Sequence, residues 1–188
     1  MIELILELLL VASPVILAAI FHMVVVRYNW LKFATYPLDH YATFRSHRIF
    51  GDNKTYRGII VMIIASIAFT YLYKWIIEQV SALSNLNLLD FNRFSPVFYG
   101  VLYGVGYVIG ELPNSFFKRQ MGISEGKSTS FIQRMIDQLD SVITLTLLLL
   151  LFSNFTLKHF WFGILFYGFL HLGINYLLYL LRLRKEPF

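Results

Sequence analysis

Long apolar runs alternate with shorter polar segments along the whole chain of 188 residues. Five runs approach the length of about 17–25 residues that crosses a bilayer, namely 2–26, 58–77, 95–111, 141–157 and 159–181. Helices are the expected form, because every backbone polar group within lipid must be bonded internally. The pattern predicts an all-α polytopic membrane protein, formed by a single integral membrane domain over residues 1–188.

Two polar segments, residues 27–57 and 112–140, separate the predicted spans and carry most of the 16 basic residues. Arg182, Arg184 and Lys185 follow the last span. Positively charged segments remain on the cytoplasmic side of a membrane. We therefore expect both loops and the C-terminus in the cytoplasm and the N-terminus outside, which an odd number of spans allows.

The composition agrees with a membrane location, since 57% of the residues are hydrophobic and only 14% are charged, against about 25% charged in soluble domains. The chain has no cysteine, which excludes disulfides, thiolate metal sites and cysteine nucleophiles. The net charge of +5 is typical of cytoplasmic loops and of contacts with anionic lipid headgroups. No nucleic-acid motif accompanies it, so no nucleic-acid partner is expected.

The second polar segment and its edges combine acids with cations. Glu111, Asp137 and Asp140 flank the basic pair Lys118 and Arg119. Carboxylates that hold a divalent cation, beside cations that hold phosphates, are the groups needed for phosphoryl or nucleotidyl transfer. On a helix, Asp137 and Asp140 would share one face and one Mg²⁺ ion, with Glu111 as a third ligand.

The first polar segment ends with Lys54, Thr55, Arg57 and Gly58 at the entrance to the second span. Lysine and arginine supply charge for a phosphate, and a helix N-terminus adds its dipole. The upstream glycines and strand of a P-loop are missing. For both polar segments the alternative is purely structural: solvated cytoplasmic charges, or charges that stabilise helix ends.

Three motifs in order, Gly51–Gly58, Ser115–Arg119 and Asp137–Asp140, resemble the CDP-archaeol synthase family. That family is related to the phosphatidate cytidylyltransferases (CDP-diglyceride synthases), which pair a Ser-x-x-Lys-Arg with a downstream Asp-x-x-Asp. The resemblance covers nearly the whole chain. It implies a Mg²⁺-dependent CTP:lipid-phosphate cytidylyltransferase of phospholipid biosynthesis, with its active site at the cytoplasmic face of the cell membrane.

The resemblance also implies roles for individual residues. Asp137 and Asp140 would hold metal, with Glu111 as a third ligand, and together with Lys118 and Arg119 would form the catalytic set. The residues that would contact nucleotide or lipid phosphate are Lys54, Thr55, Arg57, Ser115, Lys118 and Arg119. The chain departs from the family at Gly110-Glu111, where the family has Gly-Asp, and in the link over residues 125–130.

The implied partners are CTP, a membrane lipid phosphate and the bilayer, and a homodimer is kept as a hypothesis for the assembly. Two other functions remain to be weighed: a CTP-dependent lipid kinase of the polyprenol type, and a non-catalytic small transporter or scaffold. A transporter should place its ionisable groups near the bilayer midplane. Here they gather on one side, which argues against transport.

Overall fold

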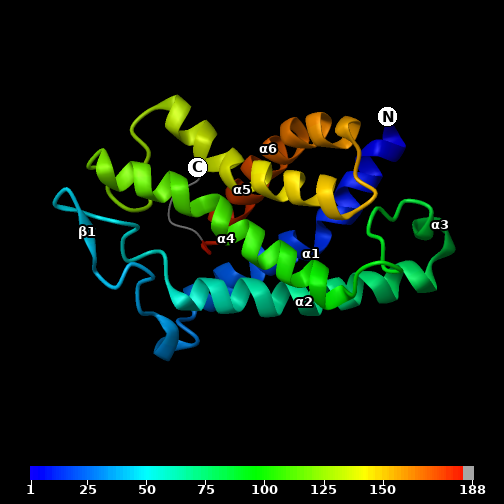
Figure 1. Cartoon of the computed structure of the whole chain (residues 1–188), viewed down its shortest axis with the longest axis horizontal. Helices are drawn as coiled ribbons and strands as arrows, with labels where there is room; N and C mark the ends of the chain where they lie inside the picture. The colour runs from blue at the N-terminus through cyan, green and yellow to red at the C-terminus, as the bar shows by residue number, and fades with distance from the viewer. Residues whose placement is uncertain (184–188) are drawn as a thin grey trace.

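The computed structural model describes residues 1–183 and consists mainly of five long helices that run alternately in opposite directions (Figure 1). They are α1 (Ile2–Arg27), α2 (Tyr56–Gln79), α4 (Pro96–Gln120), α5 (Phe131–Phe152) and α6 (Leu157–Leu180). The short elements are η1 (Lys32–Ala34), β1 (Thr43–Phe44), β2 (His47–Arg48) and α3 (Ser81–Ser84). The segments 28–55 and 121–130 lie at one end of the bundle, and the connection with α3 lies at the other.

The all-α polytopic membrane fold is confirmed. In the described part of the chain, four helices (α1, α2, α5 and α6) are long and apolar enough to cross a membrane. The fifth, α4, has 25 residues and is therefore about 37 Å long at 1.5 Å per residue. Of the three basic residues expected after the last span, Arg184 and Lys185 lie outside the described residues.

Two helices extend beyond the predicted spans. The α4 helix continues to Gln120 instead of ending at residue 111, and α5 begins at Phe131 instead of residue 141. The predicted loop 112–140 is therefore reduced to residues 121–130. The difference arises because hydropathy marks the end of an apolar run, whereas the backbone hydrogen bonds continue through polar residues.

Polar residues mark where the helices begin. Thr55, Ser95 and Ser130 precede α2, α4 and α5, and each side-chain oxygen accepts a hydrogen bond from a backbone amide in the first turn. Such caps satisfy amides that have no partner within the helix. Thr156 and His159 form a reciprocal pair of the same kind at the start of α6.

Glycines allow α4 to lie unusually close to its neighbours. A Cβ at Gly104 would be 2.5 Å from the Cα of Ile63 in α2. On the α5 side, a Cβ at Gly110 would be 2.6 Å from the Cα of Ser141. Small residues at such positions let helix backbones approach in a membrane. This packing places α4 between α2 and α5, so its polar end meets residues from both sides.

The proline in α1 leaves backbone carbonyls that other groups satisfy. Pro14 has no N–H to donate to the carbonyl of Leu10, and the hydroxyl of Ser13 donates to that carbonyl at 2.7 Å. The buried hydroxyl of Tyr103 in α4 donates to the carbonyl of Val11 at 2.5 Å. The interrupted part of α1 is thus fastened to α4 in the middle of the bundle.

Candidate active site

A cavity of about 420 Å³ lies between the helices and extends toward the end that carries the polar loops. Its charged and polar lining includes Lys54, Glu111, Asn114, Ser115, Lys118, Arg119, Asp137 and Asp140. Its apolar lining includes Ala12, Val15, Met62, Leu145 and Leu149. The volume falls in the usual range of small-molecule sites. The cavity therefore offers one charged region and one apolar region to a single ligand or to two.

The acids of α5 face cations and amides of α4. The Nζ of Lys118 lies 3.0 and 2.8 Å from the two carboxylate oxygens of Asp137. The amide nitrogen of Asn114 donates to Asp137 at 2.7 Å and to Asp140 at 2.8 Å. Positions 114 and 118 share one face of α4, and 137 and 140 share one face of α5. The two faces meet and form a charged cluster.

Two further side chains hold this cluster in place. The amide of Gln133 donates to the carbonyl oxygen of Asn114 at 2.9 Å, which orients the amide nitrogen of Asn114 toward the acids. The hydroxyl of Ser128 donates to Asp137. Asn114, Ser128 and Gln133 were not among the site residues predicted from the sequence. Only Asn114 could have been recognised, because it lies four residues before Lys118 and therefore on the same face of a helix.

A second ion pair joins the motif Gly51–Gly58 to the part of α4 just before the motif Ser115–Arg119. Lys54, just before α2, binds the carboxylate of Glu111 on α4, and their side chains are 18% and 25% exposed. A largely buried charge is stable only when it is paired. The residue that departs from the family pattern therefore lies against Lys54, beside the cluster of Asp137 and Asp140.

The chemistry of the acids is compatible with a magnesium ion. Among the described residues, no three acidic or histidine side chains converge as a ready metal site. However, Asp137 and Asp140 both accept a hydrogen bond from the same amide group of Asn114, so their carboxylates lie close enough together to share one small cation. Magnesium is commonly held by one or two carboxylates, with substrate phosphates and water completing its shell.

The other predicted site residues have separate positions. Thr55 caps α2, where it accepts a hydrogen bond from Gly58 at 3.4 Å, and it lines the cavity together with Ser115. The guanidinium of Arg57 donates to the side chain of Asn29 at 3.0 Å and to the carbonyl of Trp30 at 3.3 Å. In this arrangement Arg57 fastens the segment after α1.

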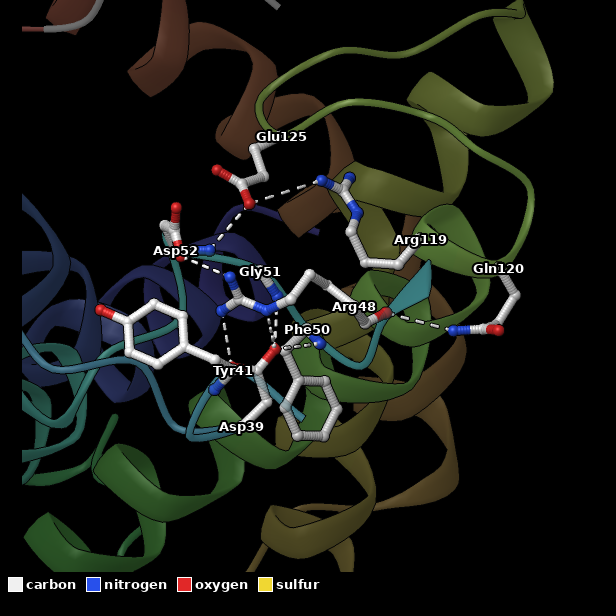
Figure 2. Close-up of polar contacts among 9 residues, drawn as sticks. All are labelled: Asp39, Tyr41, Arg48, Phe50, Gly51, Asp52, Arg119, Gln120 and Glu125. Carbon is white, nitrogen blue, oxygen red and sulfur yellow. Dashed lines mark hydrogen bonds and ion pairs between the residues drawn. The ribbon is translucent and has the colours of Figure 1, made fainter. Parts of the chain in front are cut away.

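The loop that presents Lys54 is organised around Asp39, whose side chain is fully buried. Its carboxylate accepts hydrogen bonds from Arg48 at 2.7 and 3.1 Å (Figure 2). It also accepts from the backbone amides of Tyr41, Phe50 and Gly51 at 3.1, 3.0 and 3.0 Å. One carboxylate thereby fixes both ends of a loop of about a dozen residues.

Ionisation strengthens this arrangement. Burial disfavours the charged form of Asp39, but the hydrogen bonds from Arg48 and the backbone amides outweigh it and hold the pKa of the carboxyl well below its usual value. The same contact with Asp39 raises the pKa of the Arg48 guanidinium. The side chain of Gln120, at the end of α4, donates to the carbonyl of Arg48 at 3.2 Å. The loop is therefore also attached to α4.

Comparisons with known proteins agree with the resemblance found in the motifs. A family model described as CarS-like, CDP-archaeol synthase, matches residues 1–188. CDP-archaeol synthase of Archaeoglobus fulgidus is 30% identical over 152 residues, covering 80% of this chain and 83% of that protein. The CDP-archaeol synthases of Methanosarcina barkeri and Saccharolobus islandicus are 31% and 32% identical, covering 80% of this chain and 89% and 81% of theirs.

A solved structure, described as an intramembrane enzyme for archaeal membrane lipid biosynthesis, has the same fold. Its TM-score is 0.65 at 22% identity, over 91% of this chain and 94% of the other. The family resemblance predicted from the three motifs is thus confirmed. The match over the full length, together with relatives at 30% identity or more, shows that this chain belongs to the CDP-archaeol synthase family.

Proposed function

We propose that this protein is a CTP:lipid-phosphate cytidylyltransferase that makes a CDP-activated lipid and pyrophosphate. The observation that carries the proposal is the cavity, which joins a cluster of acids and cations to an apolar region within the bundle. The apolar region suits the hydrocarbon part of a lipid, and the charged region suits its phosphate and the triphosphate of CTP. The family match supports this function. It does not support the two alternatives, a CTP-dependent lipid kinase and a non-catalytic transporter or scaffold.

The reaction forms a bond between an oxygen of the lipid phosphate and the α-phosphorus of CTP, and it breaks the bond from that phosphorus to the β-phosphate. The attacking phosphate is already anionic, so no strong general base is required. Lys118 and Lys54 line the cavity, and their ammonium groups would also bind phosphate oxygens. Positioned cations of this kind stabilise the charge that develops on the transferring group.

Asp137 and Asp140 would hold Mg²⁺, with Asn114 orienting them. When bound, the ion neutralises charge on the phosphates of CTP. Glu111 was predicted as a third ligand, and its contact with Lys54 gives it a different role in our proposal: to hold Lys54 in the cavity.

We further propose that the charged end of the cavity faces the cytoplasm. The loops 28–55 and 121–130 and the end of α6 all lie at that end of the bundle (Figure 1), and these loops together with the adjoining ends of the helices carry most of the basic residues. Basic loops stay inside, and CTP would enter from there. A homodimer remains a hypothesis, which sedimentation in detergent would test.

The test is a transfer assay with the purified protein in liposomes, Mg²⁺, CTP labelled at the α-phosphate and a panel of ester and ether lipid phosphates. Wild type is compared with Asp140→Asn and with Glu78→Gln, a control at the opposite end of α2 where Glu78 is exposed. We expect labelled CDP-lipid and pyrophosphate from wild type and the control, and at least about a hundredfold less from Asp140→Asn.

Other outcomes are equally informative. Release of the label as CDP, together with phosphorylation of a supplied lipid alcohol, would replace the transferase with a lipid kinase. A lack of turnover with every lipid, together with a lack of CTP binding, would overturn both enzymes.

A further inference from the structure

A carboxylate of the protein lies close to Arg119, one of the cations that line the cavity. Glu125, in the connection between α4 and α5, accepts a hydrogen bond from the backbone amide of Asp52 at 2.7 Å (Figure 2). The same oxygen lies 3.9 Å from the guanidinium of Arg119. These two groups come from the two motifs that carry the phosphate-binding residues of the family resemblance, and Glu125 lies between them.

The backbone is shaped to admit an anion at this point. Gly51 has a φ of +95°, and a Cβ there would lie 2.2 Å from the carboxylate oxygen of Glu125. Glycine is thus required both for the backbone conformation and for the approach of the anion to the amide of Asp52. Backbone amides exposed in this way are a common means of binding phosphate.

Arg119 is only partly satisfied by this carboxylate. The residue is 9% exposed, and its Nε has no hydrogen-bond partner among the described residues. Its distance of 3.9 Å to Glu125 is too long for a hydrogen bond. Arginine binds phosphate through two parallel hydrogen bonds, and a phosphate has more oxygens and more charge than one carboxylate. The buried guanidinium is therefore better matched to phosphate than to Glu125.

The segment that carries Glu125 has the means to move away. Gly122 and Gly126 flank it with φ values of +70° and +68°, and nothing lies within 4 Å of the place of a Cβ at either. Glu125 itself has a side chain that is 36% exposed. In the same segment, Ser128 donates to Asp137. The segment thus contacts both a cation of the site, Arg119, and an acid of the site, Asp137.

We propose that the carboxylate of Glu125 occupies the place of a CTP phosphate, between the amide of Asp52 and the guanidinium of Arg119, and that it must leave when the nucleotide binds. This inference rests on the proposed function, because it takes the phosphates to be those of CTP. Glu125 then competes with CTP for this place and lowers the affinity for the nucleotide.

The test is calorimetric titration of the full-length protein in detergent with CTP, inorganic tripolyphosphate and cytidine. Removal of the competitor in Glu125→Ala should lower the Kd of CTP and of tripolyphosphate by about two- to fivefold, the size of a half-exposed ion pair. The Kd of cytidine should not change. Asp52→Asn is the matched control, since it removes one negative charge close to the same backbone amide but from a side chain that binds Arg48 at 2.8 Å.

The results separate the possible roles. Weaker binding of both polyanions by Glu125→Ala, with a lower melting temperature, would mean that Glu125 is only a structural link between the loops. If Asp52→Asn and Glu125→Ala increase the affinity for CTP and tripolyphosphate equally, the effect is one of net charge, and the proposal would be rejected. If wild type binds tripolyphosphate but not CTP, and Glu125→Ala binds it more tightly, the anion site stands and the cytidylyltransferase function fails.

Discussion

The close contact between α2 and α4 should control both stability and catalysis, and Gly104→Ala tests it. The new Cβ would lie 2.5 Å from the Cα and 2.8 Å from the nitrogen of Ile63, whereas carbon atoms normally pack at about 3.5–4.0 Å. The two helices must therefore separate by about 1 Å. Lys54 directly precedes α2, and Glu111 lies two turns beyond position 104 on α4, so their contact would be disturbed.

The magnitude follows from two opposing terms. Overpacking costs about 1–3 kcal/mol, while alanine is favoured over glycine in a helix by about 0.8–1 kcal/mol. Gly173→Ala on α6 is the matched control, because nothing lies within 4 Å of a Cβ there. The helix-propensity term is common to both variants. Their difference in free energy of unfolding should thus equal the clash alone, about 1–3 kcal/mol.

The assay is denaturant unfolding in detergent together with the transfer assay in liposomes. Transfer should fall by up to about a hundredfold in Gly104→Ala, since a displacement of about 1 Å can have that effect, and it should be retained in Gly173→Ala. Ile63→Ala should not rescue Gly104→Ala, because it removes the contact with the Cγ1 of Ile63 at 2.9 Å but leaves the two shorter contacts, which are with backbone atoms. By contrast, Leu148→Ala should rescue Gly106→Ala, whose Cβ would meet a Leu148 methyl group at 2.6 Å.

Equal free energies of unfolding for Gly104→Ala and Gly173→Ala would refute the reasoning, because they would mean that α2 and α4 are not in backbone contact. A rescue of Gly104→Ala by Ile63→Ala would refute it as well. The clash would then involve a movable side chain, and the close approach of the two helices would not be what positions Lys54 against Glu111.

Three further predictions concern the polar end of the bundle. The pKa of Asp39 is lower in the folded protein than in the unfolded chain, where it is about 4. The charged carboxylate therefore contributes fully to stability above about pH 4, and this contribution is lost as the pH falls toward the pKa of the folded state. The difference in melting temperature between wild type and Asp39→Asn should persist at pH 5 and shrink below pH 4. Lys54→Met removes the ion-pair partner of Glu111 and should cost about 1–3 kcal/mol of unfolding free energy in detergent, which Lys54→Met with Glu111→Gln should largely restore without restoring transfer. Asn114→Ala should raise the Mg²⁺ concentration for half-maximal transfer by about 10–100-fold; an unchanged titration would show that Asn114 does not orient the two acids.

The limits of prediction are clear at particular residues. The spacing of Asp137 and Asp140 was enough to place both acids on one helix face, and the structure has them on α5 facing Lys118. The extent of that helix was not predictable from hydropathy, because its first turns are polar. Asp39 gave no signal at all, since an aspartate in a polar loop is ordinary, and its role depends on five hydrogen bonds that form only in the folded loop.

The sequence by itself determined the membrane class, the order of the helices and the gathering of the three motifs on one side, because apolar length and helical periodicity are local properties. The tertiary structure alone decided which charges meet. Lys54 binds Glu111, 57 positions away, Asn114 binds acids more than 20 positions away, and Glu125 reaches the amide of Asp52, 73 positions away. Such pairs depend on how closely glycines let the helices pack, and that distance is fixed only when all the helices are assembled.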